Sequence, residues 1–178
     1  MSSEPDPTGA VPPPPPPPPP PAVRSGELGE RFVARIIDAV LLGVVIAPVA
    51  VIIALVTSGS SGTRWFGSMV TTLLGAIVGL GYFAFMESSR GQTVGKMILS
   101  LKTLGPNGDL PTLEQALRRN SWMALSLIGI LPLLGGFIAG IAQLVAVITI
   151  AVGINNNTAT RQAWHDTFAG GTRVVKVG

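Results

Sequence analysis

One carboxylate lies inside a segment that is otherwise apolar. Asp38 is the acid in RFVARIIDAVLLGVV, which starts at Arg31. We expect a helix that continues back to Glu27, in which Arg31 lies nearly in line with Asp38, seven residues later. Arg35, three residues before Asp38, is close enough for an ion pair. An unpaired acid at the centre of a spanning helix costs roughly 2.5 to 3.5 kcal/mol. Asp38 is therefore either a titratable functional group or a structural partner of an arginine.

Two further acids follow apolar segments. Glu87 comes at the end of the second segment, and Asp166 follows His165, the single histidine of the chain. For Asp166 a structural role, capping a turn or pairing with an arginine, is favoured over a role in ion relay. The candidate arginines are Arg118, Arg119 and Arg161. We expect the acids to converge with arginines at one surface of a membrane. The predicted functional charged cluster comprises Arg31, Arg35, Asp38, Glu87 and Asp166.

Other kinds of chemistry are disfavoured by the reactive residues present. With one histidine and no cysteine, the chain offers too few soft ligands for a metal site, and we expect no cofactor. The segment GQTVGK, Gly91 to Lys96, departs from a phosphate-binding loop in its glycine spacing and in the residue after the lysine, Met97. We find no Ser/His/Asp set and no paired carboxylates on a cleft, so we do not expect an enzyme.

The composition is typical of a membrane protein. Only 12% of the 178 residues are charged, and the mean hydropathy is +0.53. Apolar stretches cover residues 36–56, 68–86 and 121–154. Each meets the length of roughly 20 residues that a spanning helix needs. The net charge of +3 comes from basic residues at the ends of these stretches, which argues against a nucleic-acid partner.

Basic residues predict the topology. They precede the first stretch and follow the second and third, whereas only Arg64 lies between the first two. We therefore expect both termini to be cytoplasmic. This requires residues 121–154 to cross twice, with a turn at LPLLGG, which contains Pro132 and Gly135. The preferred fold is an all-α bundle of four spans, about 32–56, 68–86, 121–134 and 136–154. In a three-span alternative, residues 121–131 lie in the membrane interface.

A short cytoplasmic β element is expected beside the bundle. Residues 97–104 alternate as in a strand, PNGD follows as a turn, and Thr112 with Gln115 has the spacing of a helix capping box. The tail GGTRVVKV is a second strand candidate that can pair with residues 97–104. Deep in the last span, Gln143 is the one strongly polar side chain.

The N-terminal 26 residues form a separate region. Pro12 to Pro21 is an unbroken run that favours a polyproline II rod within a disordered tail. The tail is either a spacer or a ligand for a proline-recognising protein. Residues 27–178 are expected to form the membrane domain.

Four segments together resemble one family. They are ERFVARIIDAVLL, ESSRGQTVGKMILSLKTLGPNGD, ALRRNSW and RQAWHDTFAGGTRVV. In this order they are similar to the RDD family of bacterial membrane proteins, named for an arginine and two aspartates that match Arg31, Asp38 and Asp166. Arg35 stands where the family often has an aromatic residue. The proline-rich tail ahead of such a domain resembles the actinobacterial proline-rich membrane antigens. The resemblance implies a helical domain in the plasma membrane for which transport of an unidentified ligand has been proposed.

Two functions follow from these observations. In the first, the bundle moves a small ion or solute, with Asp38 as the titratable group and Arg31 or Arg35 setting its charge state. So small a bundle would act as a homo-oligomer or with a larger membrane partner. In the alternative, the protein is a membrane-anchored adaptor whose polyproline tail binds a partner.

Overall fold

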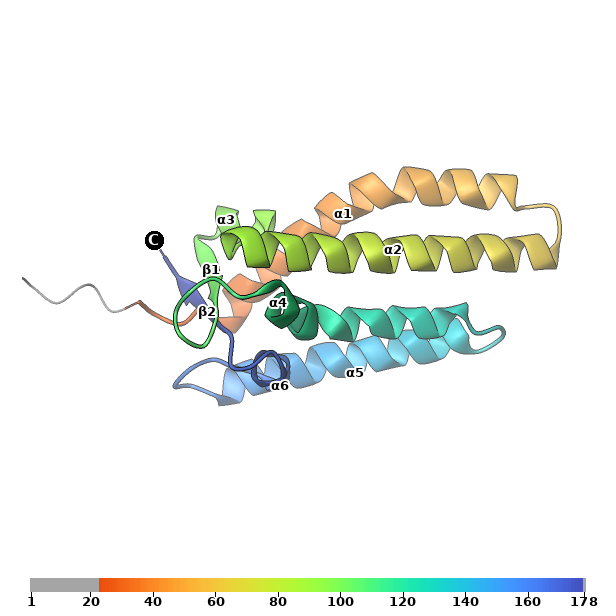
Figure 1. The fold of residues 1–178 in the computed structure, drawn as a ribbon. Coiled ribbons are helices and arrows are strands. Elements are labelled where there is room, and N and C mark those ends of the chain that lie inside the picture. Colours follow the sequence, from red (N-terminus) through yellow and green to blue (C-terminus); the bar gives the residue numbers. More distant parts are fainter. Residues whose placement is uncertain (1–22, 178) are drawn as a thin grey trace, which may run out of the picture.

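The structure is a computed structural model that describes residues 23–177. It contains two antiparallel helical hairpins, joined at one end to a two-stranded sheet and short helices (Figure 1). The elements are α1 Leu28–Val56, α2 Ser61–Arg90, α3 Val94–Ile98, β1 Leu101–Leu104, α4 Leu113–Asn120, η1 Ser121–Ile130, α5 Gly135–Asn156, α6 Trp164–Phe168 and β2 Arg173–Lys176. The predicted polyproline rod, Pro12 to Pro21, lies outside the described residues.

The first hairpin consists of α1 and α2. The helix α1 reaches back to its N-cap Glu27, as far as the sequence predicted, and the Glu27 amide donates to the Glu30 carboxylate at 3.0 Å. The Ser60 side chain caps α2, which ends at Gly91 in the left-handed conformation, with φ 71°. With 29 and 30 residues, the two helices are each about 45 Å long, which exceeds the roughly 30 Å of a bilayer core.

The second hairpin consists of η1 and α5. The chain reverses between Ile130 and Gly135, at the predicted LPLLGG break. The segment before the break is a 3-10 helix, Ser121–Ile130, in place of the α-helix expected over residues 121–134. Figure 1 shows this turn at the same end as the turn between α1 and α2. We call this end, with residues 57–60 and 131–134, the turn end, and the opposite end, with β1 and β2, the sheet end.

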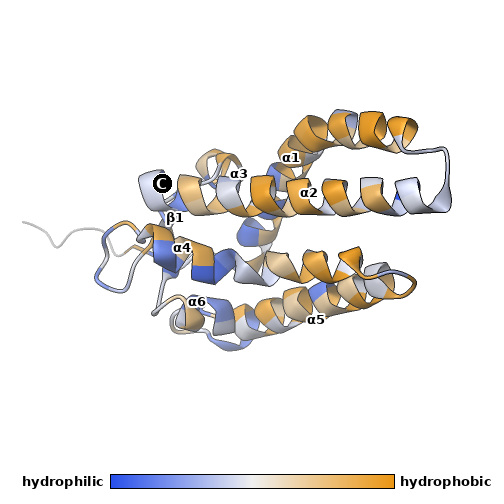
Figure 2. Ribbon diagram, turned by 45° about the vertical axis from the view of Figure 1, so that its right-hand side comes forward, coloured by the Kyte–Doolittle hydropathy of each residue, from blue (hydrophilic) through white to orange (hydrophobic). Residues whose placement is uncertain are grey.

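Apolar side chains cover the outside of both hairpins. Within the described residues, three helices are long and apolar enough to cross a membrane, namely α1, α2 and α5. Figure 2 shows their hydrophobic colouring along most of their length. Large side chains such as Val44, Leu55, Ile77 and Phe137 are exposed. Because these surfaces are not buried within the chain, they require a lipid environment.

The sheet end holds the best-packed part of the chain. Strands β1 and β2 pair antiparallel, with Leu101 opposite Lys176 and Leu104 opposite Arg173, which confirms the predicted pairing. Ala34, Leu101 and Val174 form a buried core cluster. The predicted capping box of Thr112 and Gln115 begins α4.

Two predicted boundaries at this end were wrong. Residues 97–100 are not part of the strand, because α3 occupies Val94–Ile98 with the Thr93 side chain as its cap. Ser25 forms an isolated bridge with Val175, and the Gly26 amide donates to the Val174 carbonyl at 2.9 Å. The residues directly before α1 therefore belong to the folded sheet end, although the sequence placed them in the tail.

Candidate functional site

Asp38 is held by three hydrogen-bond donors. Its side chain is 1% exposed, and it accepts from the Tyr82 hydroxyl at 2.7 Å, the Thr93 hydroxyl at 2.6 Å and the Gly95 amide at 2.8 Å. The Tyr82 oxygen in turn accepts from the Val94 amide at 3.0 Å. Since the donors come from α2 and from the α3 region, the carboxylate of α1 ties these segments together.

Within residues 23–177, which the structure describes, Arg35 and Asp38 do not form the predicted ion pair. The guanidinium carbon of Arg35 instead lies 3.7 Å from the ring centre of Phe83 and 5.1 Å from that of Trp122. Both are cation–π distances. Three donors already satisfy Asp38, and the aromatic rings of α2 and η1 offer Arg35 another partner. The spacing along α1 allows this ion pair, but both side chains instead contact residues of other elements.

Glu87 lies at the centre of a second buried group. The Lys96 ammonium and the Arg119 guanidinium both contact its Oε1, the latter at 3.1 Å. The Asn120 amide donates to its Oε2 at 3.1 Å. Lys96 and Arg119 also donate to the hydroxyl of Thr103, at 2.8 and 3.0 Å. Residues from α2, α3, β1 and α4 are thus joined around one carboxylate.

Asp166 takes both structural roles considered for it. It accepts from the Arg119 Nε at 2.9 Å and from the amide of Ala163, the N-cap of α6, at 3.1 Å. The Arg31 Nη1 lies 3.7 Å from its Oδ2. Of the three candidate arginines, Arg119 is the partner, whereas Arg118 pairs with Glu114 at 2.5 Å.

Burial and charge shift the pKa values of the groups outside the long helices. Burial lowers the pKa of Lys96 to about 8, against the attraction of Glu87. Burial, the largest single effect, would raise the pKa of Asp166, but Arg119, His165, Arg31 and the Ala163 amide together outweigh it and the pKa is lowered. The carboxylates of Glu87 and Asp166 likewise overcome burial and raise the pKa of Arg119. Both carboxylates of this network are therefore ion-pair partners of one cation.

His165 is a neutral member of the same region. Burial lowers its pKa to about 4 despite the nearby Asp166. The 3.7 Å separation of its Nε2 from the Asp166 Oδ1 is therefore a contact of an uncharged imidazole near neutral pH. Its Nδ1 is buried and has no hydrogen-bond partner among the described residues.

The structure unites part of the predicted cluster. Arg119 links Glu87 and Asp166, and Arg31 lies beside Asp166, whereas Asp38 has its own donors and Arg35 stacks on aromatic rings. Several members of these networks could not be assigned a role from the sequence. They are Tyr82, Thr93, Lys96, Thr103 and Asn120. The segments GQTVGK and ALRRNSW, which contain three of these residues, were the available signals.

Three adjoining cavities follow the bundle from end to end. The turn-end cavity, about 410 Å³, includes Arg64 and shares Ser68, Thr71 and Thr72 with the next. This middle cavity, about 630 Å³, lies between the two hairpins and extends to Arg35. The sheet-end cavity, about 140 Å³, shares Arg35 and Trp122 with it. Asp38 lines none of the three.

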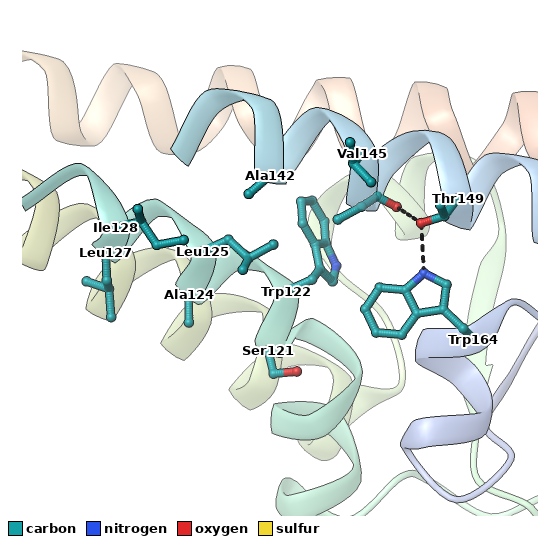
Figure 3. A pocket seen from close by; sticks show the side chains of 11 residues that line it. Ser121, Trp122, Ala124, Leu125, Leu127, Ile128, Ala142, Val145, Thr149 and Trp164 are labelled. Carbon is teal, nitrogen blue, oxygen red and sulfur yellow. Dashed lines mark hydrogen bonds between the residues drawn. The ribbon is translucent and has the colours of Figure 1, made fainter. Parts of the chain in front are cut away.

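A fourth cavity, between η1 and α5, is largely apolar. Leu125, Ile128 and Val145 are among the side chains that line its volume of about 550 Å³. Figure 3 shows the Trp164 indole donating to the Thr149 hydroxyl, at 3.1 Å, beside this cavity. A tryptophan with an apolar body and a satisfied N–H suits a membrane interface. This cavity lacks the charges of the sheet end.

Comparison with known proteins identifies the family. The RDD family matches residues 26–170, a range that includes Asp38 and Asp166. Three of the four segments quoted for the resemblance lie wholly within it, and the fourth, residues 161–175, lies within it as far as Gly170. No curated protein and no solved structure matches the chain. The family match and the apolar helices agree that this is a membrane protein. The match covers most of the 178 residues, so the chain belongs to the RDD family.

Proposed function

We propose that this bundle moves a small anion across the plasma membrane, with its sheet end and both termini in the cytoplasm. The observation that carries the proposal is the series of adjoining cavities between the turn end and the sheet end. Polar side chains at membrane depth commonly line solute pathways. The cavities supply such side chains along the bundle axis.

The middle cavity has the chemistry of a polar passage. Its lining includes the hydroxyls of Ser68, Thr71 and Ser126 and the amide of Gln143. Glycines of α2 and α5 border it, which leaves room between the hairpins. The Gln143 amide is 3.5 Å from the Met123 carbonyl, a long contact that a polar solute can replace.

The charge at the two ends favours an anion. Arg64 lines the turn-end cavity, and Arg35 lines both the middle and the sheet-end cavities. No ion pair with a described residue neutralises Arg35, whose partners are aromatic rings. In this proposal Arg35 meets the solute, and Asp38, first considered as the titratable group, positions α2 and α3.

A matched pair of glycine substitutions tests the passage. A side chain at Gly75 or at Gly81, both on α2, would have open space around its Cβ, but only Gly75 lines the middle cavity. The full chain is reconstituted in vesicles that contain a chloride-sensitive dye, and chloride entry is measured. We expect Gly75→Leu to abolish entry and Gly81→Leu to retain it.

The same vesicles distinguish other outcomes. A parallel measurement follows internal pH under sodium and potassium gradients, which reports cation-coupled proton movement. Chloride entry equal to that of protein-free vesicles, or equal entry for Gly75→Leu and Gly81→Leu, would refute the proposal. A cation-driven pH change that requires Asp38 would restore that residue as the titratable group.

The adaptor function remains a prediction from the sequence. It depends on Pro12 to Pro21, outside the described residues, and no contact of the described residues favours it. The resemblance to the actinobacterial proline-rich membrane antigens depends on the same tail. Deletion of residues 1–22 tests it, because loss of a bound partner with an intact bundle would support an adaptor.

A further inference from the structure

The sheet-end cavity combines a charged side with an apolar side. Arg31, Arg35 and His165 are among its polar lining residues, and Phe32, Val147 and Ile150 are among its apolar ones. The apolar residues belong to α1 and α5, the long helices that require lipid. The cavity thus lies between the buried charges and the lipid-facing surface.

Two polar atoms beside this cavity lack hydrogen-bond partners, although the Arg31 Nη1 lies 3.7 Å from the Asp166 Oδ2. Among the described residues, the buried side-chain nitrogens and oxygens without a hydrogen bond are the Arg31 Nη1 and the His165 Nδ1. Both residues line the sheet-end cavity. The Arg31 side chain is 8% exposed, and its other nitrogens donate to the carbonyls of Gly26 and Val174. A buried donor without an acceptor is costly, so an acceptor in the cavity would stabilise Arg31, and also His165 in the tautomer that carries its proton on Nδ1.

The charges around the sheet-end cavity do not balance, when the half-buried Arg35 is counted with the buried groups. The carboxylates are Asp38, Glu87 and Asp166. The cations around them are Arg31, Arg35, Lys96 and Arg119. Four cations against three carboxylates leave one positive charge in excess. An anion in the cavity supplies the missing negative charge.

The position of the cavity relative to the membrane favours one kind of anion. Since α1 has 29 residues and a length of about 43 Å, its ends extend beyond a hydrocarbon core of about 30 Å. Arg31 lies in the first turn of α1, at the level expected for lipid headgroups. Phe32, the next residue, is 59% exposed. An anion that carries an apolar chain therefore matches this place better than a free ion.

We propose that the sheet-end cavity binds the phosphate of an anionic phospholipid, whose oxygens accept from Arg31 and His165 while its acyl chains lie against α1 and α5. The cavity volume of about 140 Å³ is several times the roughly 30 Å³ of a water molecule. The charge-assisted bonds to arginine are the stronger kind available to a phosphate. The site is separate from the middle cavity in all but Arg35 and Trp122.

Native mass spectrometry of the delipidated full chain tests this site. Phosphatidylglycerol, phosphatidylcholine and inorganic phosphate are added in separate titrations. Ala151→Leu places a larger side chain on the cavity wall, and Val152→Leu is the matched control on α5 because Val152 does not line the cavity. We expect one phosphatidylglycerol to bind to wild type and to Val152→Leu. Binding to Ala151→Leu and to Arg31→Gln should be weaker by about tenfold or more.

Each alternative outcome overturns the proposal. Equal phosphatidylglycerol binding by Ala151→Leu and Val152→Leu means that the lipid lies elsewhere on the bundle. Phosphatidylcholine binding as tightly as phosphatidylglycerol removes the role of the net negative charge. Inorganic phosphate binding as tightly as the lipid makes this a free-anion site. Gly75→Leu should leave lipid binding unchanged, so the lipid site and the anion passage can fail separately.

Discussion

Asp38 shows how an acid is accommodated at the start of an apolar helix. Its two oxygens accept from Tyr82, Thr93 and Gly95. The donors lie on two other segments, so the carboxylate stabilises tertiary structure as well as its own charge. Sequence spacing could place Arg31 and Arg35 near this acid, but it could not identify donors that are 44 to 57 residues away.

Substitutions at Asp38 separate hydrogen bonding from charge. Asp38→Asn keeps one oxygen for Tyr82 and Gly95, and the Thr93 hydroxyl can turn to accept from the new amide. We expect it to lower the free energy of unfolding by about 1 kcal/mol, and Asp38→Ala by about 3 kcal/mol or more, because alanine leaves three donors unpaired. Unfolding in mixed detergent micelles measures both. Equal losses of unfolding free energy in Asp38→Asn and Asp38→Ala would instead show that the negative charge, and not the hydrogen bonds, is responsible.

The lowered pKa of His165 predicts that the stability of the folded chain depends on pH. Its neighbours are Asp166 on its own helix, Arg119 on α4, Arg31 on α1 and Glu87 on α2. Its pKa is about 4 in the folded chain against 6.5 for an ordinary histidine. Below pH 6.5 the unfolded chain binds a proton that the folded chain does not. The free energy of unfolding should therefore fall as the pH drops from 6.5 toward 4, by up to about 1.4 kcal/mol per pH unit.

The control for this pH effect is His165→Gln. Because His165 is the single histidine, the substitution should flatten the upper part of the pH window, where carboxylates do not titrate. Chemical unfolding of both proteins across the window gives the comparison. Parallel curves for wild type and His165→Gln would show that another group carries the dependence.

Among the elements, α3 shows why part of the sheet end could not be predicted. Alternating residues from position 97 indicated a strand, yet the cap at Thr93 and the contact of Gly95 with α1 favour a helical turn there. The strand-forming segments β1 and β2 and the capping box at Thr112 were predictable, because alternation and cap spacing are local patterns. The identity of the α3 turn depends on a tertiary contact, which a pattern along the chain does not contain.

A glycine on α3 permits that contact. A Cβ at Gly95 would lie 2.0 Å from the Ala34 carbonyl oxygen, so a side chain there requires the backbones to separate. We expect Gly95→Ala to lower the free energy of unfolding by about 3 kcal/mol. Gly43→Ala on α1 is the control, since its Cβ meets no atom within 4 Å, and helix propensity should make it stabilising by up to about 1 kcal/mol. A mild effect at Gly95 would mean that α3 moves freely on α1.

The 3-10 geometry of η1 changes how far this segment extends along the bundle. Its 10 residues rise about 20 Å as a 3-10 helix, against about 15 Å as an α-helix. α4 ends directly before η1, but η1 is the part that packs against α5, whereas α4 packs against α2 and α6. The LPLLGG break was visible in the sequence, whereas the 3-10 geometry was not. This geometry extends a short segment toward the turn end.

For the whole molecule, the distribution of charge predicts the orientation. All basic residues of the described chain except Arg64 lie before α1, in its first turns, or in segments at the sheet end. Positive residues favour the cytoplasmic side, so the sheet end should be cytoplasmic. Both hairpin turns lie at the opposite end (Figure 1). The bundle should therefore cross the membrane four times if η1 reaches the outer surface with α5.

Single cysteines can test this topology without background, because the chain has none of its own. Gly59→Cys and Leu133→Cys place thiols in the two turns, and Asn107→Cys places one in the exposed loop between β1 and α4. In intact cells we expect a membrane-impermeant maleimide to label positions 59 and 133, and to label position 107 only after permeabilisation. Labelling at 59 but not at 133 would favour three spans, with η1 and its turn held within the membrane. Labelling at position 107 alone would show that the bundle has the opposite orientation, with its buried charges outside the cell.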